Sequence, residues 1–362
     1  MIWQSLATLA LAVAASTPSD VLEKRNPDGT VRKRTEVRVT EQGESIPHGK
    51  QTFFFPDGKP SKEVHYVDGM KDGPWIEWFF NGAKIAEGNY RQDLKHGLET
   101  RFLARGLKIS DTNYENGERH GKHIEWFAVN QKSKEADYEH GQLQGDVIEW
   151  YLGGQQQKAL TRYAHGEKHG PEIRWYPNGQ KQFEAENVHD KKSGPVTEWF
   201  TAGKEKLALA YRDGKRQGML VQWYPNGNKQ MQGEYASGKQ QGPWQEWFDD
   251  QSKAAVSKWE AGLREGLQTY WHRNGQKRSE FTFRDGLREG AWADWFENGQ
   301  QRNSATYVAD KLDGEVKSWY EDGKPASLKV YKKGVKTGTW TSWDQDGRVV
   351  LETRFKDGFR LE

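Results

Sequence analysis

A glycine that recurs at a fixed interval constrains this chain more than any other feature of its sequence. From Gly49 to Gly338 a glycine stands at every 24th residue, interrupted by one additional residue between Gly145 and Gly170. Self-similarity at a period of this length is typical of repeat architectures, in which each unit packs on its neighbours. Positions within each repeat are numbered from this glycine, which is position 0. The thirteen glycines are Gly49, Gly73, Gly97, Gly121, Gly145, Gly170, Gly194, Gly218, Gly242, Gly266, Gly290, Gly314 and Gly338.

An aromatic residue stands five residues after every one of these glycines. Aromatic side chains bury a large area each, so they can form a core in a chain that has few aliphatic residues. This chain has a mean hydropathy of −1.03, and 29% of its residues are charged. We therefore predict an ordered, aromatic core in which the tryptophans at position 5 have a structural role. Position 5 holds Phe54, Phe102, Trp78, Trp126, Trp150, Trp175, Trp199, Trp223, Trp247, Trp271, Trp295, Trp319 and Trp343.

Two turn signals in each repeat predict β-hairpins. A second glycine stands at position 9 of most repeats, often within PDG or PNG, as at 56–58 and 225–227. Proline, Asp or Asn, and Gly suit a three-residue loop that closes a hairpin with a bulge. A second aromatic residue, usually tyrosine, stands at position 17 and precedes a turn such as Asp68-Gly69. Glycines at such short intervals leave no room for ordinary helices. The predicted fold is therefore all-β, an elongated single-layer antiparallel meander of about thirteen 24-residue hairpins.

Alternation along the strands predicts which positions share a face. With a loop at positions 7 to 9, position 5 lies opposite position 11, and the odd positions share one face. The aromatic residues at positions 5 and 17 would then point inward together with position 3. Positions 2, 4 and 6 would point outward and form an aromatic and acidic surface. Its candidate binding residues are Trp75, Glu77, Phe79, Glu125, Phe127, Glu149, Tyr151, Tyr176, Glu198, Phe200, Tyr224, Trp244, Glu246, Phe248, Trp292, Phe296 and Trp340.

The repeat resembles the MORN-repeat variant family, whose bacterial members include proteins labelled YwqK-type antitoxins. The resemblance rests on the glycine, Glu or Gln at position 4, Trp at 5, Phe or Tyr at 6, the turn glycine, and the later tyrosine and DG turn. It covers residues 49–358 and implies a twisted sheet used for contact with proteins or lipids. Asn130 and Gln251 replace the turn glycine, and Asn187 replaces the second aromatic residue. Asn tolerates the left-handed conformation of such turns more readily than Gln does.

The residues before the first repeat divide into two parts. Residues 1–16 contain an apolar run followed by small residues and are predicted to be a signal peptide, although a short buried helix is an alternative. The signal would place the mature protein in the periplasm, the cell envelope or the medium; without it, a cytoplasmic location is expected. Residues 17–48 are predicted to be an N-terminal cap, with the charged strand 31–39 at the edge of the sheet. The repeat array then occupies residues 49–362.

The sequence argues against catalysis, metal binding and nucleic-acid binding. Its 54 basic and 52 acidic residues form no basic stripe, and it lacks cysteine. Carboxylates at position 4 are spaced like those of glycosidases, but a repeating exposed surface offers no pocket that raises one pKa. Equivalent histidines of successive hairpins would lie ~10 Å apart, too far to share a zinc ion. We therefore predict no enzyme activity, no cofactor and no metal site. The histidines close to repeat glycines are His48, His96, His120, His140, His165 and His169.

The remaining prediction is a non-catalytic exported scaffold that binds a protein along the aromatic and acidic surface. Direct binding of cell-wall glycan or lipid headgroups, by stacked aromatic rings and carboxylates, is one alternative. Antitoxin-like inhibition of a toxin is a second alternative, and it is implied by the family resemblance alone. The surface aromatic residues could instead serve cross-strand packing within the sheet.

Overall fold

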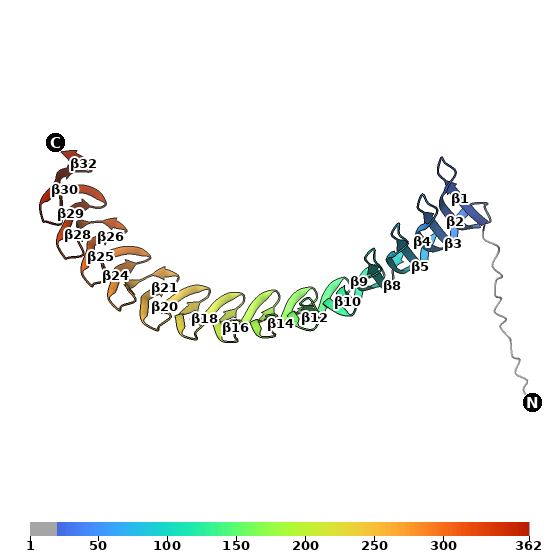
Figure 1. The fold of residues 1–362 in the computed structure, drawn as a ribbon, viewed down its shortest axis with the longest axis horizontal. Helices are drawn as coiled ribbons and strands as arrows, with labels where there is room; N and C mark the ends of the chain where they lie inside the picture. The colour runs from blue at the N-terminus through green and yellow to red at the C-terminus, as the bar shows by residue number, and fades with distance from the viewer. Residues whose placement is uncertain (1–19, 362) are drawn as a thin grey trace, which may run out of the picture. The chain divides into compact units, whose positions relative to one another are not determined.

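The computed structural model describes residues 20–361, which form strands and turns and contain no helix (Figure 1). The chain divides into two compact units, Met1–Glu167 and Lys168–Glu362, here called unit 1 and unit 2. Within each unit, successive hairpins follow one another in chain order and pair antiparallel, so the predicted all-β meander is confirmed. No helix among the described residues is long and apolar enough to cross a membrane. The predicted signal peptide, residues 1–16, lies outside the described residues.

Unit 1 contains thirteen strands within its described residues. Strands β7 and β8 are two parts of one strand, because both pair with β6. The strands are β1 (Asp20–Arg25), β2 (Val31–Val39), β3 (Ser45–Phe54), β4 (Pro60–Val67), β5 (Met70–Trp78), β6 (Lys84–Arg91), β7 (Leu94–Lys95), β8 (Gly97–Phe102), β9 (Lys108–Glu115), β10 (Glu118–Ala128), β11 (Gln131–Glu139), β12 (Gln142–Trp150) and β13 (Gln157–Ala164).

Unit 2 repeats the same arrangement from β14, whose first residue is the last of unit 1. Strands β22 and β23 both pair with β21, and β27 and β28 both pair with β26. The strands are β14 (Glu167–Trp175), β15 (Lys181–Val188), β16 (Lys191–Trp199), β17 (Glu205–Arg212), β18 (Lys215–Trp223), β19 (Lys229–Ala236), β20 (Lys239–Trp247), β21 (Lys253–Glu260), β22 (Leu263–Arg264), β23 (Gly266–Trp271), β24 (Lys277–Arg284), β25 (Leu287–Trp295), β26 (Gln301–Val308), β27 (Lys311–Leu312), β28 (Gly314–Trp319), β29 (Pro325–Lys332), β30 (Val335–Trp343), β31 (Val349–Lys356) and β32 (Phe359–Leu361).

Both predicted turns are present. In the repeat that begins at Gly73, the Phe79 N–H donates to the Ala83 carbonyl at 2.8 Å, and the Gly82 N–H donates to the Phe79 carbonyl at 2.9 Å. These bonds close a three-residue loop at positions 7 to 9, with Gly82 at a φ of 83°. In the other turn, Asp68 and Gly69 both have positive φ, 50° and 85°, as a two-residue type I′ turn requires.

The exceptions to the turn pattern keep the same turn geometry. Asn130 and Gln251 adopt left-handed φ values of 59° and 71°. The Gln251 N–H donates to the Phe248 carbonyl at 3.0 Å, as the turn glycines do in other repeats. The additional residue of the repeat that begins at Gly145 lies in its first loop, between Tyr151 and Gln156, which are joined by a backbone hydrogen bond of 3.0 Å. The chain thus absorbs these departures in loops and leaves the strand pairing intact.

One bulge changes the predicted assignment of side chains to faces. In β5 and β6, Glu77 lies opposite Ala86 and Trp78 opposite Lys84, so Ile85 at position 12 is an extra residue. The same shift occurs in all thirteen repeats. Position 5 does lie opposite position 11, but the bulge reverses the alternation beyond it. The expectation that positions 5 and 17 share a face was therefore wrong.

Two faces can now be defined from the observed register. The tyrosine face carries positions 2, 4, 13, 15 and 17, which in this repeat are Trp75, Glu77, Ala86, Gly88 and Tyr90. The tryptophan face carries positions 1, 3, 5, 14 and 16, which are Pro74, Ile76, Trp78, Glu87 and Asn89.

The most buried side chains lie on the tyrosine face, at positions 2 and 15. Trp75 is 4% exposed and packs between Val64 and Gly88, while Trp244 is 2% exposed and packs against Gly233. The tryptophans at position 5 are all half-buried. The position-5 tryptophans, which were expected to point inward, are therefore not the most buried residues, because the bulge puts the buried cross-strand pairs elsewhere.

The N-terminal edge also differs from the prediction. Strand β2, residues 31–39, pairs with β1 on one side and with β3 on the other. The edge strand of the predicted cap is therefore β1, whose six side chains are all exposed. Its charged residues Asp20, Glu23, Lys24 and Arg25 discourage pairing with other chains, which is the role expected of β2.

Candidate interaction surfaces

On the tryptophan face, each of several position-5 tryptophans is covered by a lysine of the preceding repeat. The Lys108 ammonium lies 4.0 Å from the centre of the Trp126 ring and donates to the Asp111 carboxylate at 2.8 Å. A cation within about 6 Å of an indole face is attracted by the ring quadrupole. The same set recurs as Lys132, Trp150 and Glu135, as Lys181, Trp199 and Glu184, and as Lys277, Trp295 and Glu280. These tryptophans therefore link one repeat to the next.

On the tyrosine face, a basic residue two positions before the glycine covers the ring at position 17. The Arg288 guanidinium lies 4.1 Å from the Tyr307 ring centre, and Arg119 Nη1 donates to the Tyr138 hydroxyl at 3.1 Å. This ladder was missed from the sequence, although a basic residue two places before the glycine recurs visibly. Its pairs are Lys71–Tyr90, Lys95–Tyr114, Arg119–Tyr138, Lys192–Tyr211, Arg216–Tyr235, Arg264–Phe283, Arg288–Tyr307 and Lys336–Phe355.

The predicted aromatic and acidic surface is only partly accessible. Trp75 and Trp244 are buried, whereas Phe127 and Glu246 are exposed. At position 6, the hydroxyls of Tyr176 and Tyr224 donate to backbone carbonyls of the next repeat, at 2.9 and 3.0 Å. Several position-4 carboxylates form ion pairs, such as Glu198 with Lys206 at 3.1 Å. The half-buried members are Glu77, Phe79, Glu125, Glu149, Tyr151, Tyr176, Glu198, Phe200, Tyr224, Phe248, Trp292, Phe296 and Trp340.

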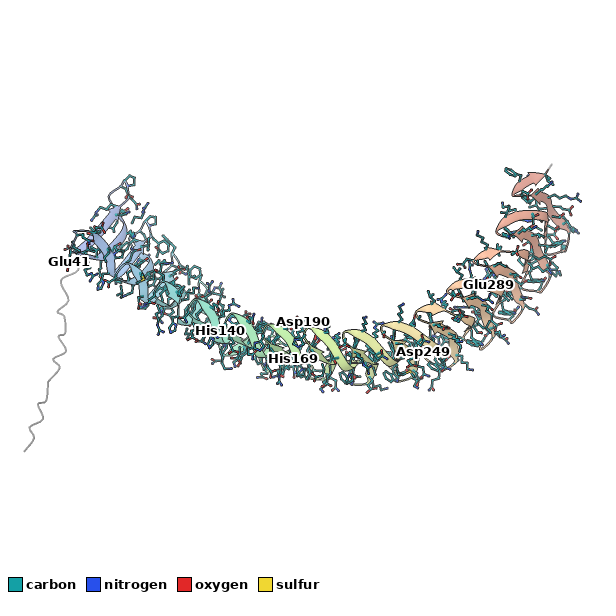
Figure 2. All side chains as sticks on the ribbon, turned by 180° about the vertical axis from the view of Figure 1, so that it is seen from behind. Glu41, His140, His169, Asp190, Asp249 and Glu289 are labelled. Atoms are coloured by element: carbon teal, nitrogen blue, oxygen red, sulfur yellow. The ribbon has the colours of Figure 1, made fainter. Side chains whose placement is uncertain are left out.

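In several repeats the residue before the repeat glycine accepts a hydrogen bond from an amide of the turn that follows. Glu289, labelled in Figure 2, accepts a hydrogen bond at 2.8 Å from the Ala309 N–H, and Gln241 accepts one at 2.9 Å from the Ala261 N–H. Ala309 and Ala261 occupy the left-handed position of the two-residue turn, with φ values of 47° and 49°. A polar side chain before the glycine therefore satisfies a turn amide.

Four of the histidines at these turn positions form two pairs. The rings of His120 and His140 have centres 5.4 Å apart, and those of His169 and His189 are 5.1 Å apart (Figure 2 labels His140 and His169). The two rings of each pair come from opposed turn positions and not from equivalent positions of successive hairpins, so the expected separation of ~10 Å does not apply to them. Among residues 20–361, no group of three or more His, Cys, Asp or Glu side chains is arranged to hold a metal ion.

An apolar strip remains exposed on the tryptophan face of unit 2. It consists of Leu263, Leu267, Leu287, Val308 and Val335, which are 43–54% exposed. Their positions, 1, 18 and three before the glycine, all lie beside the two-residue turns. The Leu263 side chain lies along the next turn, because a Cβ added to Gly286 would stand 3.3 Å from its Cδ2. The Leu263 side chain therefore reaches from its own turn to the turn of the next repeat.

Comparison with known proteins identifies the repeat. The model of the MORN repeat variant family matches residues 47–68, 168–187, 264–285 and 312–333. No curated protein matches this chain. The sequence resemblance to this repeat is thereby confirmed in both units.

Among solved structures, the chain is similar at 10% identity to the Tc holotoxin pore of Photorhabdus luminescens, with a TM-score of 0.17. That match covers 94% of this chain and 23% of the toxin chain. A TcdB2–TccC3 complex with Cdc42 matches at 10% identity and a TM-score of 0.14, covering 93% of this chain and 20% of that one. The chain thus spans about a quarter or less of these proteins, and scores this low transfer neither architecture nor activity. What the family match establishes is that these four segments of the chain are MORN-variant repeats.

Proposed function

We propose that the chain is an exported, non-catalytic scaffold that binds a protein partner along the apolar strip of unit 2. The observation that carries this proposal is the exposure of five large apolar side chains in successive repeats of a chain whose mean hydropathy is −1.03. Contiguous exposed apolar surface in a polar protein marks interaction sites. The strip replaces the buried Trp75 and Trp244 as the surface on which a partner binds.

The surroundings of the strip resemble the rim of a protein interface. Leu287 lies directly opposite Arg284, Val308 opposite Lys311, and Val335 opposite Lys332. Apolar residues flanked by charged ones give a partner both desolvated contacts and polar specificity. Glycan binding relies instead on open aromatic faces, and on this side of the sheet Trp295 is covered by Lys277. A protein partner therefore suits the strip better than a glycan does.

The proposal is tested by capturing partners with the full chain from soluble, wall and membrane fractions of the source cells. A variant carrying Leu263→Ser, Leu287→Ser and Val335→Ser should lose a protein that the unchanged chain retains at a fixed stoichiometry. The matched control carries Glu198→Gln and Glu246→Gln on the tyrosine face and should retain that protein. If the control loses the protein and the serine variant keeps it, the acidic surface binds the partner and the strip does not. Recovery with wall or membrane material and without a protein would refute the proposal.

Export is proposed from residues 1–16 and is tested separately. Fractionation of cells that express the tagged chain should place it in the periplasm, envelope or medium, and deletion of residues 2–15 should move it to the cytoplasm. A chain that stays cytoplasmic with its N-terminus intact would overturn this part of the proposal.

A further inference from the structure

The buried positions of the tyrosine face are polar in two successive repeats of unit 1. Position 2 is Trp75 or Val147 in the flanking repeats, but it is Glu99 and then His123, which are 4% and 6% exposed. His123 Nδ1 is hydrogen-bonded to the Thr112 hydroxyl at 2.8 Å, and its Nε2 to the Glu125 carboxylate at 3.0 Å. Buried polar groups are costly unless they are paired, so their concentration here requires an explanation.

Glu99 is held as a carboxylate by two cations. Lys95 donates to one of its oxygens, and Arg101 Nε donates to the other at 2.7 Å. Burial raises the pKa of Glu99, but these two hydrogen bonds outweigh it and leave the pKa below its ordinary value. The Glu99 carboxylate is thereby satisfied, whereas the terminal Nη groups of Arg101 have no hydrogen-bond partner among residues 20–361.

Arg101 departs from the repeat pattern in the sign of its charge. It occupies position 4, which holds Glu77 in the preceding repeat and Glu125 in the following one. Arg101 lines a pocket of 530 Å³, together with Arg119, Tyr114, Ser110, Ser133 and Glu125. Pockets that bind small molecules typically have volumes of about 300–1,000 Å³ and a few convergent polar groups.

Unit 2 contains the same three ionic residues, with a different residue opposite the arginine. Lys168 and Arg174 pair with Glu172 at 3.3 and 3.7 Å, as Lys95 and Arg101 do with Glu99. The Arg174 guanidinium, however, lies 4.2 Å from the ring centre of Phe183, which stands directly opposite it.

The residue opposite Arg101 is Ser110, which occupies the position of Phe183. Serine in place of phenylalanine removes the ring on which the guanidinium would stack. The Arg101 guanidinium therefore has no aromatic ring opposite it on which to stack, and its N–H donors remain available to a ligand in the pocket. The ion triad recurs in both units and is structural, whereas a serine stands opposite its arginine in unit 1 and a phenylalanine in unit 2.

We propose that this pocket binds a small polyol that carries an oxyanion, such as a sugar phosphate or a uronic acid. The Arg101 guanidinium, with Arg119 beside the same pocket, receives the phosphate or carboxylate, because a planar fork of N–H donors matches two oxyanion oxygens. The Glu125 carboxylate and the hydroxyls of Ser110 and Ser133 bind the ligand's hydroxyl groups. The proposal does not depend on the binding of a protein to the apolar strip.

Isothermal titration of the full chain with glucose 1-phosphate, glucuronate and glucose tests this site. Binding of one or both anions, with glucose at least tenfold weaker, is expected. Binding of one anion alone would identify the oxyanion as phosphate or as carboxylate. Equal binding of all three compounds, or no binding at about 10 mM, would overturn the proposal, because even weak specific sites bind below this concentration.

Ser110→Phe is the decisive variant, because it recreates the arrangement of Arg174 and Phe183 and so should fold. It should abolish anion binding, and Arg101→Gln should weaken binding by about tenfold to a hundredfold, as expected for lost charge-assisted hydrogen bonds. Arg174→Gln in unit 2 is the matched control and should leave binding unchanged. If Ser110→Phe folds and still binds the anion with unchanged affinity, the pocket is not the site. Should Arg101→Gln fail to fold, Glu125→Gln at a half-exposed position provides the second measurement. It keeps the shape of the side chain but replaces one acceptor oxygen by an NH₂ donor, and so it should weaken binding of the ligand's hydroxyl groups.

Discussion

Replacing Gly233 by alanine should destabilise unit 2 through a single steric contact. Gly233 stands at position 15, against the buried indole of Trp244. An added Cβ would lie 2.1 Å from Cδ2, 2.3 Å from Cε2 and 2.5 Å from Cγ of Trp244. These atoms belong to a rigid ring, so the side chain cannot move a flexible end aside. The backbone of Gly233 has an ordinary φ, so this position does not need glycine for its conformation.

The magnitude follows from two opposing effects. Overpacking a well-packed site costs typically 1–3 kcal/mol, while Gly→Ala at a compatible position stabilises by about 0.4–1 kcal/mol through the unfolded chain. The net expected loss is about 1–2 kcal/mol. Trp244→Leu removes the ring, and the neighbouring repeat already packs Leu209 and Leu220 at the equivalent positions. In that background, Gly233→Ala should be neutral or stabilising.

Amide hydrogen exchange of β19 and β20 measures the local free energy of opening, which suits a repeat protein that does not unfold as one unit. The four proteins of the double-mutant cycle should give a coupling energy of about 1–3 kcal/mol. Gly88→Ala is the matched control, because its Cβ would approach Trp75 only to 3.0 Å and should cost less. An equal cost of Gly233→Ala in the unchanged chain and in the Trp244→Leu background would refute the steric reasoning.

Three further predictions concern other contacts. Because the folded-state pKa of Glu99 lies below its ordinary value, the contribution of Glu99 to stability is present at neutral pH and is lost as pH falls below about 4. Amide hydrogen exchange in β8 and β9 should therefore accelerate below this pH, and Glu99→Gln should remove that pH dependence. Lys108→Met should lower the free energy of opening of β10 by about 0.5–1 kcal/mol, because it removes the cation above the Trp126 ring. Lys108→Arg should keep most of this free energy. Equal exchange rates in the Met and Arg variants would contradict the cation–π assignment. Gln251→Gly should raise the midpoint of local unfolding, because it relieves about 1 kcal/mol of strain in the left-handed backbone conformation of Gln251. A lower midpoint would mean that the hydrogen bond from Gln251 to Asn228 outweighs that strain.

The turns were predictable from sequence because few residues tolerate their backbone conformations. Gly82 and the Asp68-Gly69 pair indicate left-handed geometry, and even Asn130 stands where its residue type allows it. The bulge at position 12 was not predictable in the same way. Ile85 occupies it in one repeat and Ser133 in another, both with ordinary negative φ, so no residue type marks the extra residue.

The core was missed for a related reason. Position 2 holds Trp75, Glu99, His123 or Val147, and so no single residue type reveals that it is buried. Position 5 is almost uniform, which invited the inference that it forms the core. In four repeats the position-5 tryptophan instead makes an inter-repeat contact, in which a lysine of the preceding repeat stacks on its indole, as Lys108 stacks on Trp126. Size complementarity between positions 2 and 15, as in Trp244 with Gly233, was the sequence signal that could have located the core.

In a repeat protein, the sequence can distinguish residues that pack one repeat on the next from residues that bind a ligand. A residue that joins repeats must recur, because each junction poses the same problem, whereas a residue that binds a single ligand is needed once. The network of Lys95, Glu99 and Arg101 recurs in unit 2 and therefore serves packing. Ser110 differs from its counterpart Phe183: Ser110 lines the pocket beside Arg101, whereas the Phe183 ring stacks with the Arg174 guanidinium. Ser110→Phe tests this separation directly, since it should remove ligand binding while the recurring network, and with it the fold, is retained.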